Sequence, residues 1–157
     1  MQIKANINTP IGTLTAIADD QSLCKLLFIE QCPAKIEFGE NQIILRLKQE
    51  LDDYFNGKLR KFTIPIKQNG SEFEILAWNS LQKIPFGETI SYKQQAEIIG
   101  KVKSFRAVAN ANGRNQIMII IPCHRVIKND FSLGGYVVGI DKKQFLIEHE
   151  KHYKSNL

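Results

Sequence analysis

Apolar and polar residues alternate along the first thirty positions of the chain, in three short runs at residues 3–7, 14–18 and 23–29. The segments Thr9-Pro10-Ile11-Gly12 and Asp19-Asp20 separate these runs and consist of residue types that favour turns. Alternation with a period of two is typical of β-strands that are buried on one face. The pattern therefore predicts an antiparallel meander of three strands.

The period changes to that of an α-helix between residues 41 and 55. The apolar positions that recur at helical spacing are Ile43, Ile44, Leu47, Leu51, Tyr54 and Phe55. Asn56-Gly57 ends the pattern, so we expect one amphipathic helix on a small sheet. A Gln68-Asn69-Gly70 breaker follows, and we place a domain boundary near Gly70, which divides the chain into domains 1–70 and 71–157.

Beyond residue 70 the pattern predicts helices separated by tight turns. Ser71 can cap a first helix that ends before Pro85-Phe86-Gly87. A second helix begins near Ser91 and stops at Gly100, and Ser104 can cap a third. The inward positions expected in the second and third helices are Tyr92, Ala96, Ile99, Phe105, Val108, Ala109 and Asn112. This order suggests a helix-turn-helix, although an ordinary helical hairpin has the same periodicity.

Composition places the chain among globular proteins. Its 157 residues are 43% hydrophobic and 24% charged, which excludes disordered and fibrous classes. The apolar run 117–121 is far shorter than the ~20 residues of a membrane helix, and the first ten residues lack the apolar region of a signal peptide. The three cysteines form no Cys-x-x-Cys pair, so we expect reduced thiols in a cytoplasm. The three histidines all lie in the last third, and no metal or cofactor is implied.

The positive charge is concentrated in the second half of the chain. The formal net charge is +5, and residues 91–130 carry seven basic side chains against two acidic ones. This local excess fits a polyanion such as nucleic acid. A solvated lysine-rich surface is the commoner explanation when charge is considered alone.

The outward stripe of the predicted third helix favours the nucleic acid. Its members are Lys103, Arg106, Ala107, Asn110, Ala111 and Arg114. Small side chains let a helix lie close to a ligand surface, whereas a stripe that serves solubility more often pairs Glu with Lys.

The segment Pro122-Cys123-His124-Arg125 carries the candidate chemistry. It brings a thiol, an imidazole and a guanidinium together where an apolar run ends. Cysteine nucleophiles react as thiolates, and adjacent basic groups lower the thiol pKa. A buried inert cysteine beside an incidental histidine would give the same dipeptide. Glu150 lies four residues after Leu146, beside an apolar helix face, where a carboxylate needs a partner.

This motif also carries a family resemblance. PCHRVI, with RAV seventeen positions before the cysteine and GETISY some thirty before it, resembles the O6-alkylguanine-DNA alkyltransferases, the methylated-DNA-protein-cysteine methyltransferases. The likeness is strong over residues 73–150 and general over residues 1–70. It implies an α/β protein, with a small RNase H-like sheet-and-helix domain followed by a mainly helical domain with a winged-helix-like helix-turn-helix.

The resemblance implies a role for five residues of the reaction site. Cys123 accepts the alkyl group, and His124 deprotonates it through a water while Glu150 orients the histidine. Tyr92 donates a proton or hydrogen bond to the departing guanine. Asn115 holds the turn of the active site.

The resemblance also implies how the protein engages DNA. Arg106 enters the duplex from the minor groove and fills the space of the extruded base, because the thiol cannot reach the alkyl group inside the stack. Tyr136 and Pro122 belong to the substrate pocket. The full set expected to contact DNA is Lys103, Arg106, Ala107, Asn110, Ala111, Arg114 and Arg125.

Three features depart from the family pattern. Asn115-Gln116 stands where many relatives have Asn-Pro, which loosens the turn, and Ala109 stands where they usually have Gly, which thickens the helix near the groove. Some relatives bind zinc in the first domain, but no histidine precedes His124 here, which argues against that site.

The expected function is direct repair of DNA by irreversible, stoichiometric transfer of the alkyl group from O6-alkylguanine to Cys123, by a monomer. The sequence leaves open whether O4-alkylthymine is also a substrate. One alternative is an alkyltransferase-like sensor of damage, but such relatives lack the acceptor cysteine that this chain has. Another is a Cys-His-Glu hydrolase, which gives no reason for the basic helix.

Overall fold

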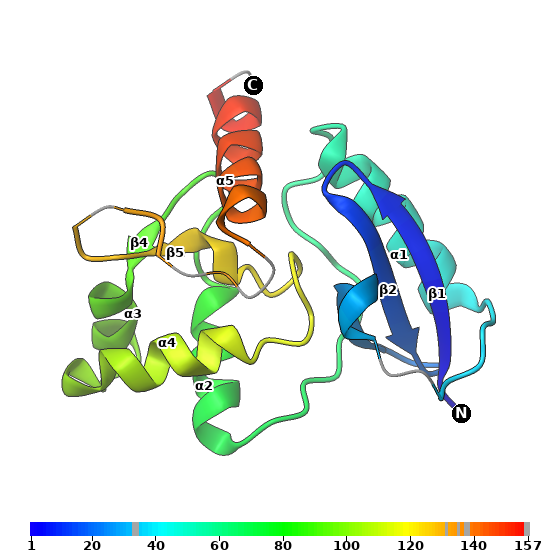
Figure 1. Cartoon of the computed structure of the whole chain (residues 1–157), viewed down its shortest axis with the longest axis horizontal. Helices are drawn as coiled ribbons and strands as arrows, with labels where there is room; N and C mark the ends of the chain where they lie inside the picture. The colour runs from blue at the N-terminus through cyan, green and yellow to red at the C-terminus, as the bar shows by residue number, and fades with distance from the viewer. Residues whose placement is uncertain (33–34, 131, 135, 137–138, 156–157) are drawn as a thin grey trace. The chain divides into compact units, whose positions relative to one another are not determined.

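The chain forms two compact units (Figure 1). This computed structural model describes residues 1–32, 35–130, 132–134, 136 and 139–155. The first unit comprises Met1–Asn69 with Gln116–Met118, and the second comprises Gly70–Asn115 with Ile119–Leu157.

The first unit contains a three-stranded sheet, as the alternating pattern predicts. Strands β1 (Ile3–Thr9), β2 (Gly12–Ala18) and β3 (Leu23–Phe28) pair in that order, and both pairs are antiparallel. Gly12 has a φ of 120° in the turn between β1 and β2, a conformation that favours glycine. The apolar side chains of the middle strand are fully buried, so the sheet carries the core of this unit.

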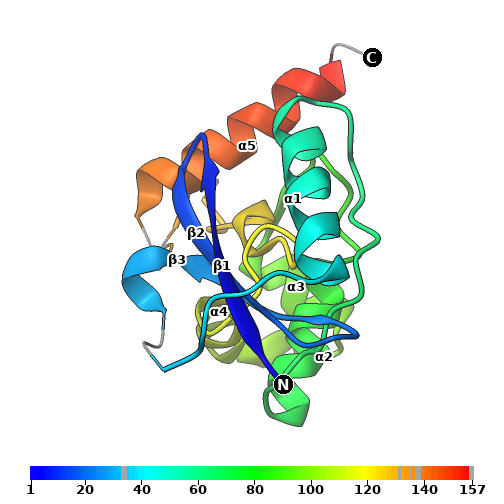
Figure 2. The same cartoon turned by 90° about the vertical axis from the view of Figure 1, so that its right-hand side faces the viewer.

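Helix α1 (Gln42–Phe55) packs against this sheet (Figure 2). Its first turn is capped by Asn41, whose side chain accepts a hydrogen bond from the Ile44 amide. Its buried face repeats at helical spacing and consists of Ile43, Ile44, Leu47, Glu50, Leu51 and Tyr54. The helix ends at the predicted Asn56-Gly57, where Gly57 has a φ of 77°.

The short segment Gln116–Met118, which follows helix α4 (Phe105–Gly113) in sequence, belongs to the first unit. Residues 116–118 run beside β3: the Leu26 amide donates to Gln116 O at 2.8 Å, and the Met118 amide donates to Leu26 O at 3.0 Å. The next residue, Ile119, has a φ of 71° and is the one non-glycine residue with positive φ in the described part of the chain. A β-branched residue is strained there, so the path into the Pro-Cys-His-Arg segment is tightly constrained by its surroundings.

The second unit is built on four helices: α2 (Glu72–Leu81), α3 (Tyr92–Ile98), α4 (Phe105–Gly113) and α5 (Ile140–Ser155). Ser71 forms a capping box with Glu74, so this predicted cap is confirmed. Ser91, near which the second helix was expected to begin, forms a capping box with Gln94. Ser104 precedes α4 but its side chain makes no capping hydrogen bond, so that predicted cap is wrong. No helix among the described residues is long and apolar enough to cross a membrane.

Helices α3 and α4 pack together and are joined by a short 3₁₀ turn, η2 (Val102–Ser104), in a helix-turn-helix arrangement. Gln95 of α3 and Asn112 of α4 are buried and exchange two hydrogen bonds, of 3.0 and 2.7 Å. The Trp78 indole of α2 donates to Ala111 O at 2.8 Å. These buried polar contacts fix the three helices relative to one another. The short strands β4 (Ile90–Ser91) and β5 (Val126–Ile127) pair in parallel beside them.

Candidate functional site

The Pro-Cys-His-Arg segment lies inside the second unit. Residues Cys123–Arg125 form a single 3₁₀ turn, η3, that leads directly into β5 and packs against α2 and α5. Pro122 and His124 are buried, and Cys123 is 9% exposed. The strained Ile119 and the buried apolar residues around it fix the backbone that leads to Cys123. The thiol therefore lies in a well-packed position.

His124 and Glu150 form a buried pair. His124 Nε2 lies 2.7 Å from Glu150 Oε2, and both side chains are almost completely inaccessible to solvent. Burial alone raises the pKa of Glu150, but the neighbouring His124 and Arg125 outweigh it and hold this pKa well below its usual range. An ionised carboxylate only accepts, so Nε2 carries the proton and donates it. The buried Nδ1 atom has no hydrogen-bond partner among the described residues, which leaves its lone pair available as a base.

Arg125 corrects one prediction. Its guanidinium is buried, donates from Nε and Nη2 to the two Glu150 oxygens at 2.8 and 3.1 Å, and donates from Nη1 to Ile84 O at 2.6 Å. It was expected to contact DNA, but its hydrogen-bonding groups face the protein interior. Its role is to anchor the carboxylate that holds His124, together with the Gly87 amide, which donates to Glu150 Oε1 at 3.3 Å.

Asn115 holds the turn of the site, as predicted. Its Nδ2 donates to Ile121 O at 2.7 Å and to Cys123 Sγ at 3.3 Å. Burial raises the pKa of the Cys123 thiol, and the Asn115 hydrogen bond and the Lys143 charge offset this rise only in part. The expected net lowering of the thiol pKa is therefore wrong for the resting protein, and activation requires a base.

Lys143 is a residue of the site that the motif reading did not identify. It lies in the first turn of α5, is 0% exposed, and its Nζ is 5.7 Å from the centre of the Tyr92 ring. Burial lowers its pKa to about 8, while the Cys123 charge acts in the opposite direction. A signal existed in the sequence, because Lys143, Leu146, Ile147 and Glu150 share one helix face. A lysine on a buried apolar face needs a specific partner.

Tyr92 and Tyr136 line a cavity of about 690 Å³ and lie within electrostatic reach of the Cys123 thiol. Burial and the Cys123 charge raise the pKa of each phenol, and that of Tyr136 rises well above its ordinary value. Both phenols therefore keep their protons at neutral pH and can act as hydrogen-bond donors. The volume is within the usual range of small-ligand sites. Pro122 is buried immediately before Cys123 and, like Cys123, is not among the described residues that line this cavity, so its place in the substrate pocket stays a prediction.

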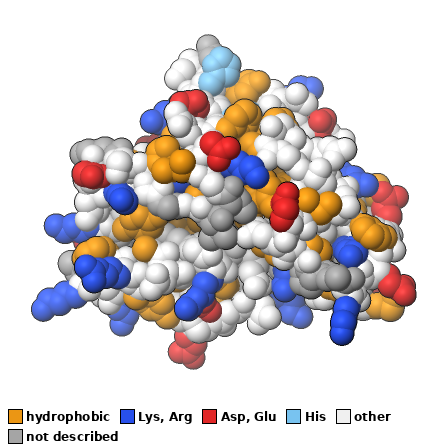
Figure 3. All heavy atoms as spheres, in the orientation of Figure 1, with side chains coloured by type: hydrophobic (Ala, Val, Ile, Leu, Met, Phe, Trp, Pro, Cys, Tyr) orange, Lys and Arg blue, Asp and Glu red, His pale blue; other side chains and the backbone are white. Residues whose placement is uncertain are grey.

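The predicted stripe of α4 is exposed at most of its positions. Lys103, Arg106, Ala107 and Asn110 are exposed, and Arg106 and Asn110 also line the cavity. Figure 3 shows Lys and Arg side chains gathered where α3 and α4 form the edge of this unit, with hydrophobic side chains between them. Arg114 is exposed as well, although its Nη1 lies 3.4 Å from Glu74 Oε2.

Ala111 corrects a second prediction. It is 2% exposed, because it faces α2 and its carbonyl accepts from Trp78. The helix therefore turns Ala107 outward and Ala111 inward. Within the described part of the chain, no group of three or more His, Cys, Asp or Glu side chains is placed to hold a metal ion.

Fold and site together define a class of protein. A buried cysteine lies beside a buried His-Glu pair and within electrostatic reach of two phenols that line a cavity. Helix α4 of the helix-turn-helix, which carries exposed basic side chains, lines the same cavity. These features define a protein with a candidate cysteine nucleophile beside a basic helix-turn-helix surface.

The family follows from comparison with known proteins. Residues 72–152 match the family model described as "6-O-methylguanine DNA methyltransferase, DNA binding domain", and residues 3–68 match the one described as "6-O-methylguanine DNA methyltransferase, ribonuclease-like domain". The chain belongs to the methylated-DNA-protein-cysteine methyltransferase family. The second match also confirms the ribonuclease-like sheet-and-helix expected for the first domain.

Individual relatives match over almost their whole length. A methylated-DNA-protein-cysteine methyltransferase of Methanosarcina barkeri is 40% identical over 152 residues, which cover 93% of this chain and 95% of the relative. The structure of Mycobacterium tuberculosis O6-methylguanine methyltransferase superposes with a TM-score of 0.90 at 36% identity and covers 98% of this chain and 94% of its own. The Mycobacterium tuberculosis OGT in complex with DNA gives a TM-score of 0.89 at 38% identity, with 94% of this chain and 92% of its own covered.

Proposed function

We propose that this protein repairs alkylated DNA directly, by moving the alkyl group from O6 of guanine to its own Cys123. The observation that carries the proposal is the buried thiol held by Asn115 beside a His124-Glu150 pair, in a chain of the methylated-DNA-protein-cysteine methyltransferase family. It is accordingly a methyltransferase whose acceptor is part of its own chain.

The proposed chemistry begins with the thiol proton. His124 Nδ1 accepts it through one water, and Glu150 stabilises the resulting imidazolium. The thiolate sulfur then forms a bond to the alkyl carbon, the bond between that carbon and O6 breaks, and its electron pair passes to the purine. Tyr92 donates a proton to the purine anion, and the proton held on His124 returns to Tyr92 through solvent. The net products are a thioether and guanine.

The proposed reaction is irreversible, so each molecule works once. A thioether offers water no carbonyl or phosphoryl centre to attack. The second unit supplies both the nucleophile and the surface for DNA, and we assign both activities to residues 71–157. O4-alkylthymine would have to enter the same cavity in order to be a substrate.

DNA engagement is proposed to use α4 from the minor groove. Arg106 is exposed at the cavity wall, where a guanidinium is suited to replace a base extruded from the stack. Lys103, Ala107, Asn110 and Arg114 are exposed along the same helix and its preceding turn. We propose that α3 and α4 act as a winged-helix-like module. Binding then depends little on sequence and weakens as salt rises.

We further propose that the protein acts as a monomer in the cytoplasm. Cys24, Cys32 and Cys123 are reduced thiols in this structure, which suits a reducing compartment.

A titration tests the proposed function. Increasing amounts of a duplex that contains one O6-methylguanine are incubated with a fixed amount of protein, and the guanine restored is measured. We expect product to saturate at one guanine per protein molecule and Cys123→Ser to give none. A damage sensor would bind the duplex without product, and a hydrolase would turn over esters or amides many times. Either result would refute the proposal.

A further inference from the structure

Phe105 is an exposed aromatic residue at the first position of α4. The apolar spacing of this helix predicts that Phe105 points inward, but in the structure its side chain is 40% exposed. A single exposed apolar residue is common on protein surfaces and needs no explanation by itself. The surroundings of Phe105 therefore decide whether it has a role.

Phe105 lines the same cavity as Tyr92, Tyr136 and Arg106. The two tyrosines lie within electrostatic reach of the Cys123 thiol, whose charge raises the pKa of both phenols. Phe105 and its neighbour Arg106 come from α4, the helix that carries the basic stripe. Phe105 is thus an aromatic wall of the cavity on the side of the proposed DNA surface.

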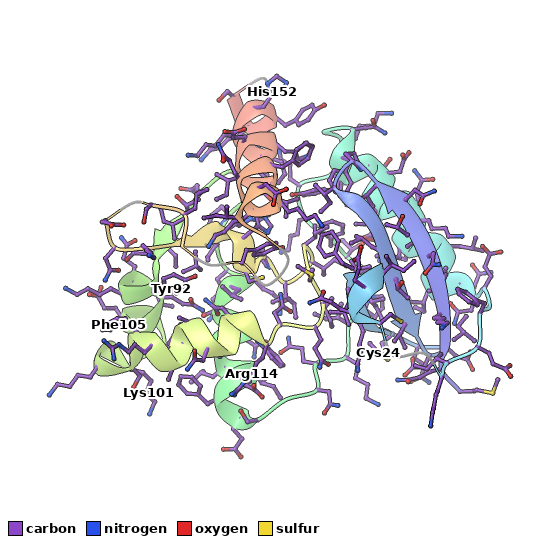
Figure 4. All side chains as sticks on the ribbon, viewed as in Figure 1. Cys24, Tyr92, Lys101, Phe105, Arg114 and His152 are labelled. Atoms are coloured by element: carbon purple, nitrogen blue, oxygen red, sulfur yellow. The ribbon has the colours of Figure 1, made fainter. Side chains whose placement is uncertain are left out.

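Basic side chains lie near Phe105 in the chain or line the same cavity, which also contains one acidic residue, Asp130. Lys101, Lys103 and Arg106 are exposed within four residues of Phe105 in the chain, and Lys128 lines the cavity with it. Figure 4 shows Phe105 and Lys101 at one end of α4 and Arg114 near its other end. Aromatic rings among basic side chains are the pattern by which proteins hold unpaired nucleotides: the ring stacks on a base and the cations contact phosphates.

We propose that Phe105 is a substrate-binding residue that stacks on the everted nucleotide at the mouth of the cavity. This inference rests on the proposed function, because a base of a duplex exposes its face for stacking only when its nucleotide is turned out of the helix. It goes further by assigning the ring that holds such a nucleotide outside the helix. It predicts that Phe105 acts mainly on lesions in DNA, because stacking on the ring offsets the cost of holding a base outside the helix, and a free alkylated base has no such cost.

The test compares four variants on two substrates under single-turnover conditions. The substrates are a duplex with O6-methylguanine and the free base O6-benzylguanine, and the variants are Phe105→Ala, Phe105→Leu, Phe105→Trp and Phe145→Ala. Phe145 is the matched control, because it is also 40% exposed but lies on α5, where it stacks on His149. Loss of one stacked base corresponds to a reduction of about 5-fold to 150-fold.

We expect Phe105→Ala and Phe105→Leu to lose duplex repair by that amount, and Phe105→Trp and Phe145→Ala to stay within about twofold of the parent. All four should react with the free base within about twofold of the parent rate. The leucine variant keeps an apolar side chain but has no aromatic ring. It therefore distinguishes stacking on a base from a general hydrophobic contact.

Three results would overturn the inference: a parental duplex rate for Phe105→Ala, a parental duplex rate for Phe105→Leu, or equal losses on both substrates, which would indicate a structural role. Failure of the parent protein to alkylate Cys123 with either substrate would instead refute the proposed function. The two failures are therefore distinguishable.

Discussion

Lys143 is a fully buried lysine, and burial is unfavourable for a positively charged side chain. Its amine is fully buried in the first turn of α5, against the Tyr92 ring and within electrostatic reach of Cys123. The Cys123 charge favours the protonated form of this amine, although burial lowers its pKa to about 8. By the same electrostatic attraction we expect Lys143 to stabilise the Cys123 thiolate.

Replacing Lys143 tests this assignment. Lys143→Met keeps the length of the side chain and removes the charge, so the pKa of the Cys123 thiol should rise further and its alkylation by iodoacetamide at pH 7.5 should slow several-fold. The measurement is the rate of modification of the Cys123 peptide from pH 6 to 10. Lys151→Met, at an exposed position of the same helix, should behave like the parent. An unchanged titration midpoint in Lys143→Met would show that the amine does not act on the thiol.

Glu150 makes folding stability depend on pH in a defined direction. Its pKa in the folded protein is well below the reference value of 4.5, because His124 and Arg125 favour the ionised form. Below about pH 4.5 the unfolded chain takes up a proton that the folded protein does not, so stability falls as pH falls. The contribution is fully present above that pH.

Glu150→Gln should remove this contribution. The parent should lose up to about 1.4 kcal/mol of unfolding free energy per pH unit from this group alone, and the variant should lose correspondingly less. At pH 7 the variant should be less stable by about 3–5 kcal/mol, because Arg125 is left buried without its partner. Urea unfolding between pH 3 and 7 measures both effects, with the exposed Glu148→Gln as control. Equal pH slopes in the parent and in Glu150→Gln would contradict the depressed pKa.

At the residue scale, the sequence predicted which side chains come together at the candidate site. It did not predict which residues hold those side chains in place. Cys123, His124, Asn115 and Glu150 are brought together as expected, because a short motif and one helical repeat fix their relative places. Arg125 was assigned to DNA because a sequence shows charge but not which way a side chain turns. Its true partner is 25 residues away in the chain.

Helix α4 is the element on which DNA engagement depends. Its start and its outer face carry Phe105, Arg106, Ala107 and Asn110, and its inner face is fixed to α2 and α3 by Ala111 and by the Gln95-Asn112 pair. The outer face of α4 is therefore held in a fixed position by α2 and α3. A binding surface for a duplex requires such a rigid element.

Arg106→Ala should separate base extrusion from chemistry. Extrusion costs a few kcal/mol, so the variant should repair a duplex at least about tenfold more slowly than the parent. Its reaction with O6-benzylguanine, which needs no extrusion, should stay within about twofold of the parent rate. The two rates measured side by side check the prediction. A parental rate on the duplex would remove Arg106 from the mechanism, and equal losses on both substrates would indicate a general defect.

The elements themselves were largely predictable from the sequence. Three strands, α1 and the capped helices α2 and α3 follow from periodicity and from residues such as Asn41, Ser71 and Ser91. The errors lie at the ends of helices, where periodicity is weakest: Phe105 begins α4 and projects outward, and Ser104 does not cap it. Ala111 was misplaced because a stripe of small residues fits either face of a helix.

At the scale of the whole molecule the chain is divided into two units by packing, and the candidate site residues lie in one of them. The second unit contains the thiol, its base, the cavity and the basic helix, whereas the first unit is a sheet with one helix. Gln116–Met118 crosses from the second unit to pair with β3 and returns immediately before the reactive turn. This excursion was not predictable, because an apolar run of five residues does not reveal which segments its backbone will pair with.

The alkylation state of the whole molecule tests the central claim most directly. The protein is incubated with excess duplex that contains O6-methylguanine, digested and mapped by mass spectrometry, with Cys24 and Cys32 as internal controls. The account predicts one added methyl group per molecule, located on the peptide that contains Cys123, and no further product after the first turnover. Methylation at Cys24 or Cys32 in place of Cys123, or repeated turnover by an unmodified protein, would contradict it.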